Sequence, residues 1–324
     1  MILKEDELLL KDFAIILFGF ILLIKGSEYM IDAASKLAKS LKVPAFIIGF
    51  SIVAFGTSAP ELIIGIVTGV SKTNHISMGD VLGSSIANIA LVIAIAAIIK
   101  PIHIEKTIII KEMPLMFAVQ IFLLFIFFIG GVLSKIDGII LLLSFIVFLF
   151  YIYTRSKTSL HIDDEDINDQ NNSITKKESR VKLIIILILS IASVVLGGNF
   201  VVVSSTGIAR SFGVSEFIIG LTLVAVGTSL PELITTIIAI IKGKDEIAVG
   251  NIIGSNIFNV LLVLGVSSSI NPIDKMKGVE WDFVFVFGST ILLFLLSFRK
   301  KQLKRYSGII LLIFYLSYLA LKVI

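Results

Sequence analysis

Residues 46–62 read FIIGFSIVAFGTSAPEL, and residues 217–233 read FIIGLTLVAVGTSLPEL. Twelve of the 17 aligned positions are identical, at a constant offset of 171 residues. Each copy places one glutamate, Glu61 or Glu232, in an otherwise apolar stretch, which makes both candidate functional residues. The chain therefore contains two copies of one unit, and the same offset pairs Gly26 with Gly197, Gly79 with Gly250, Ser84 with Ser255, Asn88 with Asn259 and Pro101 with Pro272.

The composition is that of a membrane protein. Of 324 residues, 56% are hydrophobic and 16% are charged, and the mean hydropathy is +1.03, whereas soluble domains carry about 25% charged residues. The apolar runs are solid and do not alternate with period two, so we exclude a β-barrel. We predict an all-α membrane protein with ten transmembrane helices, near residues 13–35, 43–70, 78–99, 113–129, 136–153, 183–209, 215–241, 248–269, 283–298 and 307–323.

The predicted helices form two repeats of five, residues 1–154 and 183–324, joined by a polar linker at 155–182. Because five is odd, the second repeat must be inverted relative to the first. The segments after the odd-numbered helices carry 19 of the 28 Lys and Arg residues, whereas the termini and the other segments carry 8. The positive-inside rule then predicts a cytoplasmic linker and two extracellular termini. The basic charge is explained by topology, so no nucleic-acid partner is needed.

Two features exclude other kinds of metal site. The chain has no cysteine, so thiolate sites, iron–sulfur clusters and disulfides are excluded. In the linker, Asp164, Asp166 and Asn168 match the first ligands of an EF-hand, but Asp169 and Thr175 stand where glycine and glutamate are required. We expect the linker to be a solvated tether.

The second predicted helix of each repeat carries a proline one residue before its glutamate. Pro60 has no N–H for the carbonyl of Gly56, so the turn should open and free backbone carbonyls. Thr57 and Glu61 are spaced i, i+4 and share the face beside this turn. The second repeat has the same arrangement in Ala225, Thr228, Ser229, Pro231 and Glu232. A proline kink with hydroxyls bonded to the backbone would explain Thr57 and Ser58, but not a glutamate at this depth in both repeats.

The next helices read GDVLGSSIAN (79–88) and GNIIGSNIFN (250–259). Their glycines allow close helix packing, and Ser84 with Asn88, and Ser255 with Asn259, again form i, i+4 pairs. Hydrogen bonds between helices explain the serines as well as ion binding does. Carboxylates, hydroxyls, amides and carbonyls together make an all-oxygen set, which suits Ca²⁺. Two carboxylates can be neutralised by one Ca²⁺ or by two Na⁺, so the two ions would exclude each other.

GTSAPE and GTSLPE, each followed by a G-x-x-G-S-x-I-x-N helix, resemble the paired α-repeats of the cation/calcium exchanger superfamily, in particular its prokaryotic sodium/calcium exchangers. The resemblance covers both halves of the chain. It implies a central core of helices 2, 3, 7 and 8, and alternating access by sliding of helices 1 and 6. It also implies antiport of several Na⁺ inward for each Ca²⁺ expelled across the cell membrane.

The resemblance also implies ligands. Glu61 and Glu232 would bind Ca²⁺ with the carbonyls of Thr57 and Thr228. The flanking Na⁺ sites would use Ala54, Ser58 and Ser84 on one side and Ala225, Ser229 and Ser255 on the other, with Asn88 and Asn259 in the middle.

Two positions depart from the pattern or from the repeat. Close archaeal relatives and the potassium-dependent branch have Asp where this chain has Asn259, so the middle site has one negative charge fewer and potassium dependence is disfavoured. Asp80 pairs with Asn251 in the second repeat. It could extend the ion pathway, but we expect an acid at a helix N-terminus.

Other functions remain as alternatives. Proton-coupled exchangers carry G-N-x-x-E in helix 2, unlike this chain, and potassium-assisted transport stays open within the same class. A cation channel generally has its symmetry axis along the membrane normal, unlike an inverted repeat. The sequence contains no nucleotide-binding loop, hydrolase motif or nucleophile–base arrangement, so we predict no enzyme and no cofactor. The expected partners are Na⁺, Ca²⁺ and the lipid bilayer, and we expect a monomer.

Overall fold

The computed structural model describes residues 2–73, 75–160, 179–212, 225–276, 278–298 and 301–323. Within them, eight helices are long and apolar enough to span a membrane, and a bent pair at Ala45–Thr57 and Ala59–Ser71 makes a ninth. The predicted span at 215–241 lies partly outside the described residues, and its second half contains only short helices. The all-helical membrane fold is confirmed, and the total of ten helices stays a prediction.

The first repeat contains α1 (Ile2–Leu41), α2 (Ala45–Ile48), η1 (Gly49–Val53), α3 (Ala54–Thr57), α4 (Ala59–Ser71), α5 (His75–Ala87), η2 (Asn88–Ile93), α6 (Ala94–Ile99), β1 (Ile102–His103), η3 (Ile108–Glu112), α7 (Met113–Gly130), β2 (Val132–Leu133) and α8 (Lys135–Leu160), where η marks a π-helical segment. The second contains α9 (Arg180–Ser211), α11 (Ala225–Thr228), α12 (Leu230–Ile241), α13 (Asp245–Phe258), η5 (Asn259–Leu264), α14 (Gly265–Ile270), β3 (Ile273–Asp274), α15 (Val279–Phe298), β4 (Gln302–Leu303) and α16 (Arg305–Val323). The linker predicted at 155–182 is therefore helical at both ends, and the EF-hand-like residues lie outside the described residues.

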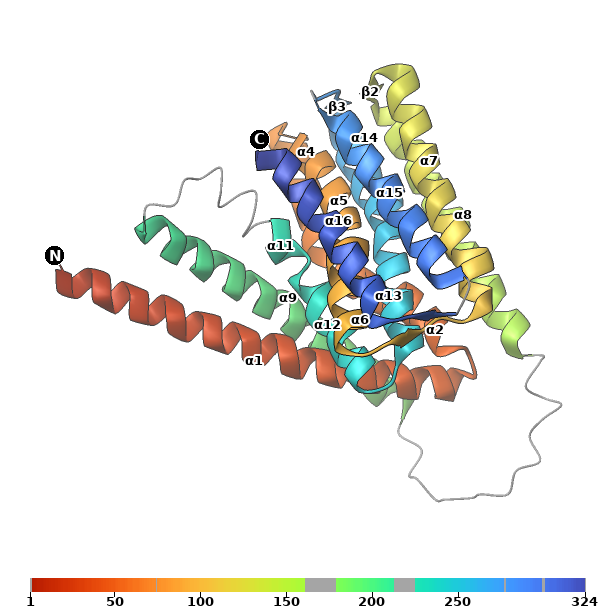
Figure 1. Cartoon of the computed structure of the whole chain (residues 1–324), viewed down its shortest axis with the longest axis horizontal. Coiled ribbons are helices and arrows are strands. Elements are labelled where there is room, and N and C mark those ends of the chain that lie inside the picture. The colour runs from red at the N-terminus through yellow and green to blue at the C-terminus, as the bar shows by residue number, and fades with distance from the viewer. Residues whose placement is uncertain are drawn as a thin grey trace.

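Two short strand pairs are arranged as the inverted symmetry predicts. β1 pairs with β4, and β2 pairs with β3, so each pair joins one strand from each repeat. Ile102 lies opposite Leu303, and its repeat counterpart Ile273 lies opposite Leu133. The β2–β3 pair lies at the top of Figure 1, and the dark blue β4 lies beside β1 near the bottom. Equivalent pairs at opposite ends are what two inverted repeats require.

The segments after the odd-numbered predicted helices gather at one end of the molecule. The Lys100 ammonium donates to the carbonyl of Ile240, and the Arg180 guanidinium donates to the carbonyl of Ser40. The backbone N–H of Ile104 donates to the carbonyl of Lys301. These contacts agree with the up-and-down path that the sequence predicts.

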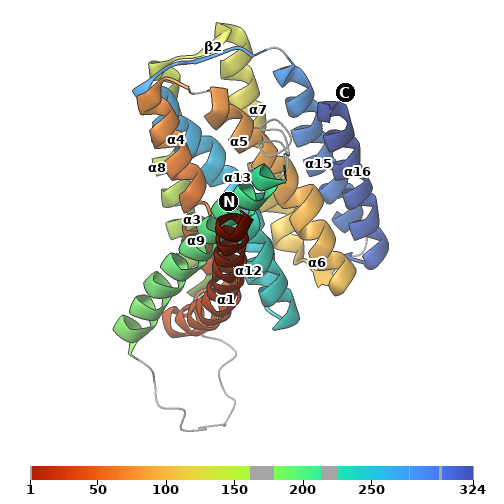
Figure 2. The same cartoon turned by 90° about the vertical axis from the view of Figure 1, so that its left-hand side faces the viewer.

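Two long helices, α1 and α9, cross beside the rest of the bundle. They lie side by side in Figure 1, and in Figure 2 α1 is seen nearly end-on while α9 runs obliquely past it. At about 1.5 Å per residue, the 40 residues of α1 are longer than the about 30 Å hydrocarbon layer, which explains the tilt of α1. A Cβ at Gly19 would lie 2.9 Å from the carbonyl oxygen of Gly197, so the backbones touch.

The third and eighth predicted helices form the centre of the fold. In the most apolar windows of the spans Asp245–Ile270 and His75–Ile99, 94% and 72% of the residues are buried, against 22% for Lys135–Ser156 and Arg305–Lys322. Close backbone packing makes this possible, because a Cβ at Gly250 would lie 2.6 Å from the carbonyl oxygen of Phe46. The expected close-packing role is confirmed for Gly250 and for Gly254 against Phe50, but not for Gly79 and Gly83, where an added Cβ would meet no described atom within 4 Å.

Each peripheral helix pair is fastened by a buried acid. Glu112 accepts hydrogen bonds from Tyr151, at 2.7 Å, and from Arg155, at 3.0 Å, which join η3 to α8. In the second repeat, Asp282 accepts from Tyr318, at 3.0 Å, and from Lys322, at 2.8 Å, which join α15 to α16. These acids have bases as partners and are therefore structural.

Candidate ion-binding site

Both proline-containing helices break next to their glutamates. α3 ends at Thr57 and α4 begins at Ala59, with a 45° bend between the two halves of the span. Ser58, at the break, has φ −84° and ψ 9°, and its repeat counterpart Ser229 has φ −85° and ψ 2°. The predicted opening of the turn is confirmed in both repeats, and Glu61 and Glu232 lie in the first turns of α4 and α12.

The serines at the breaks do not cap their helices. Ser58-x-x-Glu61 and Ser229-x-x-Glu232 have the spacing of a capping box, yet neither serine side chain makes a capping hydrogen bond. Instead, the Ser58 hydroxyl donates to Glu232 Oε1 at 3.3 Å. The Ser58 hydroxyl is therefore turned toward the other repeat, whereas the Ser229 hydroxyl is buried and has no hydrogen-bond partner among the described residues.

Glu232 collects hydroxyl groups from two helices. It is fully buried and accepts from Ser58 and, at 3.4 Å, from Ser255 on α13. Ser255 Oγ also lies 3.5 Å from the carbonyl oxygen of Ala54. Thr57 Oγ1 lies 3.0 Å from Asn251 Oδ1 and 3.3 Å from the same Ala54 carbonyl. This group, which we call the Glu232 half-site, consists of Ala54, Thr57, Ser58, Glu232, Asn251 and Ser255.

This arrangement corrects the expected grouping of flanking residues. Ala54 was expected on one side with Ser84, and Ser255 on the other with Ala225. The structure brings Ala54 and Ser255 together, because η1 and α3 pack against α13 of the other repeat. Each half of the site is therefore built by both repeats.

Glu61 lies at the centre of the second half-site, which the repeat relates to the Glu232 half-site. It is fully buried, and neither carboxylate oxygen has a hydrogen-bond partner among the described residues. The negative charges of Glu232 and Asp80 both act on it. Thr228 Oγ1 donates to Asp80 Oδ1 at 3.3 Å. By the repeat relationship the Glu61 half-site consists of Glu61, Asp80, Ser84, Ala225, Thr228 and Ser229, although the side chain of Ala225 lies outside the described residues.

Several predicted ligands carry buried oxygens without hydrogen-bond partners among the described residues, as do other residues such as Ser77, Ser85 and Asn256. A buried polar atom is normally hydrogen-bonded, and each exception needs an explanation. In the described part of the chain, such atoms include oxygens of Glu61, Ser84, Asn88, Ser229, Glu232 and Asn259. Asn88 and Asn259 are both fully buried and begin the π-helical segments η2 and η5. π-helical turns often mark functional sites, so the matched pair belongs with the glutamates.

The comparisons with known proteins agree with this geometry. The family described as sodium/calcium exchanger protein matches residues 11–154 and 182–324. This chain belongs to the sodium/calcium exchanger family. The sodium/calcium exchanger MaX1 of Methanosarcina acetivorans is 33% identical over 341 aligned positions, which cover 95% of this chain and 97% of MaX1. The inner membrane protein YrbG of Escherichia coli is 32% identical over 302 positions, which cover 92% of each chain.

A solved structure has the same fold. The sodium–calcium exchanger NCX_Mj, in crystals soaked with Na⁺ and Sr²⁺, superimposes with a TM-score of 0.82 at 29% identity. The match covers 96% of this chain and 99% of NCX_Mj. The resemblance read from GTSAPE and GTSLPE is confirmed, and the chain is a multi-pass membrane protein of a transporter family.

The atoms of this chain that could bind a cation are oxygen atoms of several kinds. Among the described residues, no three His, Cys, Asp or Glu side chains gather closely enough to hold a metal ion. A cation between Glu61 and Glu232 would therefore depend on hydroxyl, amide and backbone oxygens as well. Such mixed oxygen ligation is what Ca²⁺ and other hard cations accept.

The structure corrects the expectation for Asp80. The residue was expected at a helix N-terminus, but α5 begins at His75 and its first turn contains no acidic residue. Asp80 instead reaches Thr228 of the other repeat. Its counterpart Asn251 makes the equivalent contact with Thr57, and the motif analysis gave Asn251 no role. The sequence could have indicated this role, because Asp80 precedes Ser84 by four residues and Asn251 precedes Ser255 by four residues.

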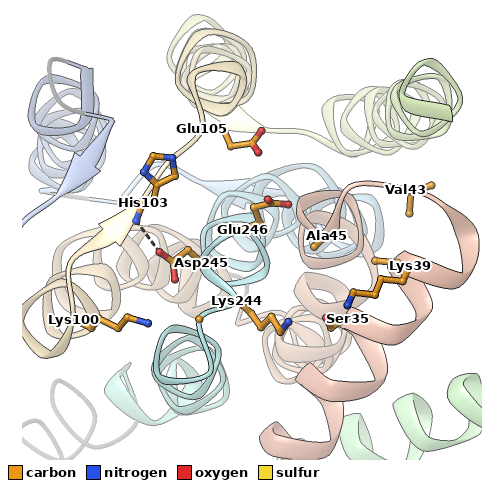
Figure 3. A pocket seen from close by; sticks show the side chains of 12 residues that line it. Ser35, Lys39, Val43, Ala45, Lys100, His103, Glu105, Lys244, Asp245 and Glu246 are labelled. Carbon is orange, nitrogen blue, oxygen red and sulfur yellow. Dashed lines mark hydrogen bonds between the residues drawn. The ribbon is translucent and has the colours of Figure 1, made fainter. Parts of the chain in front are cut away.

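A separate hollow lies at the end of the molecule where the odd-numbered segments gather. Its volume is about 490 Å³, and Lys39, Lys100, His103, Glu105, Asp245 and Glu246 are among its lining residues (Figure 3). The carboxylate of Asp245 accepts a hydrogen bond from the backbone N–H of His103 at 2.8 Å. Basic and acidic side chains are mixed there, and none of the predicted ion ligands lines it. The hollow is therefore distinct from the glutamate site.

Glu28 and Asp32 on α1 are not ion ligands. Glu28 pairs with Lys25 at 2.8 Å, and Asp32 pairs with Lys242 at 2.7 Å. These two acids therefore form ion pairs near the end of the first helix.

Proposed function

We propose that this protein is a secondary active antiporter that exchanges Na⁺ for Ca²⁺ across the cell membrane by alternating access. One observation carries the proposal. Two fully buried glutamates, Glu61 and Glu232, lie at repeat-related helix breaks within reach of each other's charge. Two carboxylates in a membrane interior, with no basic side chain bonded to them in the described residues, require cations to balance them.

The charge balance favours exchange over simple binding. One Ca²⁺ or two Na⁺ neutralise Glu61 and Glu232, so loading by one ion excludes the other. With either ion bound, the two glutamates are neutralised, and the loaded site can change its access from one membrane face to the other. An unloaded site has two buried charges. This difference couples the flux of one ion to the opposite flux of the other.

We assign the ligands as follows. Glu61 and Glu232 bind Ca²⁺ together with the backbone carbonyls of Thr57 and Thr228 at the broken turns. Na⁺ occupies the flanking half-sites, which supply the hydroxyls of Ser58 and Ser255 in one case and of Ser84 and Ser229 in the other. Asn88 and Asn259 lie between the half-sites. Their amide oxygens, which have no hydrogen-bond partner among the described residues, support this assignment.

The long helices α1 and α9 supply the moving part in this mechanism. They contact each other more extensively than any other described pair of elements, and glycines let them approach closely. Sliding of such a pair past the core would expose the site alternately to the two membrane faces. The excess of basic residues supports an orientation with the segment 155–182 in the cytoplasm and both termini outside.

The decisive experiment is ⁴⁵Ca²⁺ uptake by proteoliposomes that contain the purified full-length chain. Vesicles loaded with Na⁺ should accumulate Ca²⁺ when diluted into Na⁺-free buffer, whereas K⁺-loaded vesicles should not. A proton gradient imposed without Na⁺ is the control for the proton-coupled alternative. Uptake driven equally by protons would contradict the proposal.

A further inference from the structure

The two half-sites have the same geometry but not the same charge. Thr57 Oγ1 lies 3.0 Å from Asn251 Oδ1, and Thr228 Oγ1 lies 3.3 Å from Asp80 Oδ1. Asp80 and Asn251 occupy equivalent positions on α5 and α13, as do Thr57 and Thr228 on α3 and α11. The contact between the repeats is therefore conserved within the molecule, but a neutral amide in one half is a carboxylate in the other.

The surroundings of Asp80 leave this carboxylate without a counter-charge. Among the described residues, its buried Oδ2 atom has no hydrogen-bond partner, and no Lys, Arg or His forms a salt bridge with it. Its charge acts on Glu61, which is itself an acid. Two acids near each other without a base must be neutralised, either by protons or by a bound cation.

A second group points to a ligand at the same place. Ser84 lies one turn after Asp80 on α5, so the two side chains share a helix face. Ser84 is only 2% exposed, and its hydroxyl makes no hydrogen bond of 3.5 Å or less in the described residues, although it lies close enough to Glu61 to act on that carboxylate. Its repeat counterpart Ser255 is bonded, because it donates to Glu232. A buried hydroxyl next to two acids, one of them the half-buried Asp80 with no basic partner among the described residues, is a place where a cation can bind.

We propose that Asp80 is a third anionic ligand of the transport site, and that with Ser84 and Thr228 it binds Na⁺. The inference rests on the proposed exchange function and deepens it. Asp80 does not complete the shell of a single divalent ion, because no three acidic, His or Cys side chains converge in the described residues. One carboxylate with neutral oxygens balances one monovalent ion. The Glu61 half-site therefore binds Na⁺ more tightly than the Glu232 half-site, where Asn251 stands.

The test compares two reciprocal variants, Asp80→Asn and Asn251→Asp, in the purified full-length protein. Binding of ⁴⁵Ca²⁺ is measured at equilibrium, and the Na⁺ concentration that displaces half of it is determined. For Asp80→Asn we expect this concentration to rise about tenfold, as when a charged ligand becomes neutral. The Ca²⁺ dissociation constant should change by a smaller factor than the Na⁺ requirement, because Asp80 acts on the Ca²⁺ ligand Glu61 only through its charge. Asn251→Asp adds a carboxylate to the other half-site and should lower the Na⁺ concentration required.

The outcomes separate this inference from the proposed function. Wild-type protein that binds no Na⁺-displaceable Ca²⁺ would overturn the proposed function itself. Wild-type displacement with an unchanged Na⁺ requirement in Asp80→Asn would overturn only the role of Asp80. An equal loss of Na⁺ and Ca²⁺ binding would make Asp80 a general structural or Ca²⁺-binding residue and would also overturn it. If Asp80→Asn fails size-exclusion chromatography, Ser84→Ala should show the same selective rise in the Na⁺ requirement, and an unchanged requirement there would refute the inference.

Discussion

Ser58 and Glu232 come from different repeats, 174 positions apart, yet the Ser58 hydroxyl donates to Glu232 Oε1 at 3.3 Å. The serine stands where a helix-capping residue would stand, but it makes no capping bond. The broken helix of one repeat therefore helps to build the carboxylate environment of the other. Residues of both repeats therefore contribute to one site, so movement of either repeat changes the surroundings of Glu232.

Glu61→Gln and Glu232→Gln should each reduce Na⁺-driven Ca²⁺ uptake to the background of empty vesicles. Each change removes a charged ligand but also removes the cost of burying a charge, so expression and thermal stability should stay close to wild type. Uptake in proteoliposomes and melting curves measure the two effects. Glu28→Gln is the matched control, because Glu28 is paired with Lys25 on the surface of α1. Normal flux in either glutamate variant would remove that residue from the site.

Asn259→Asp should make transport sensitive to protons. The new carboxylate would lie at the depth of Glu61 and Glu232, and like charges close together in a low dielectric favour proton binding. Exchange should persist at alkaline pH and decline on acidification, with a flatter profile for the wild type. The assay should be run with and without K⁺, since the carboxylate could admit K⁺ as a co-substrate. Identical pH and K⁺ profiles would place residue 259 outside the ion site.

The crossing of α1 and α9 should not tolerate a side chain. A Cβ at Gly197 would lie 2.7 Å from the carbonyl oxygen of Gly19, and backbone cannot yield as a flexible side chain does. Gly197→Ala should therefore destabilise the protein by about 1–3 kcal/mol and slow exchange. Gly130→Ala is the control, because an added Cβ there meets no described atom within 4 Å. Equal melting temperatures for the two variants would contradict the close packing.

The orientation in the membrane has its own test. The wild-type chain has no cysteine, so a single Ser173→Cys substitution in the linker gives an unambiguous label. An impermeant thiol reagent should react with it only after the cells are permeabilised. Lys72→Cys, in the exposed segment after α4, should react in intact cells. The reverse pattern would invert the topology.

The sequence alone determined the class of fold and most of the candidate site. Inside a membrane every backbone N–H and C=O must be hydrogen-bonded within the protein, so long apolar runs predict helices directly. The internal repeat then predicts the inversion, since each copy carries an odd number of spans. Proline before glutamate predicts a broken turn beside a buried charge, and the φ and ψ angles of Ser58 and Ser229 confirm it.

The tertiary structure decided which residues meet. Offsets within one helix predict a shared face, as for Thr57 with Glu61, but they carry no information about the helix packed opposite. Glycine contacts place α13 against η1 and α3, and this packing joins Ala54 to Ser255 and Thr57 to Asn251. The same reasoning explains Asp80: the sequence shows an acid near a helix start, and only the packing of the two repeats brings it to Thr228. Contacts across an inverted repeat depend on the geometry of both copies, which no local pattern encodes.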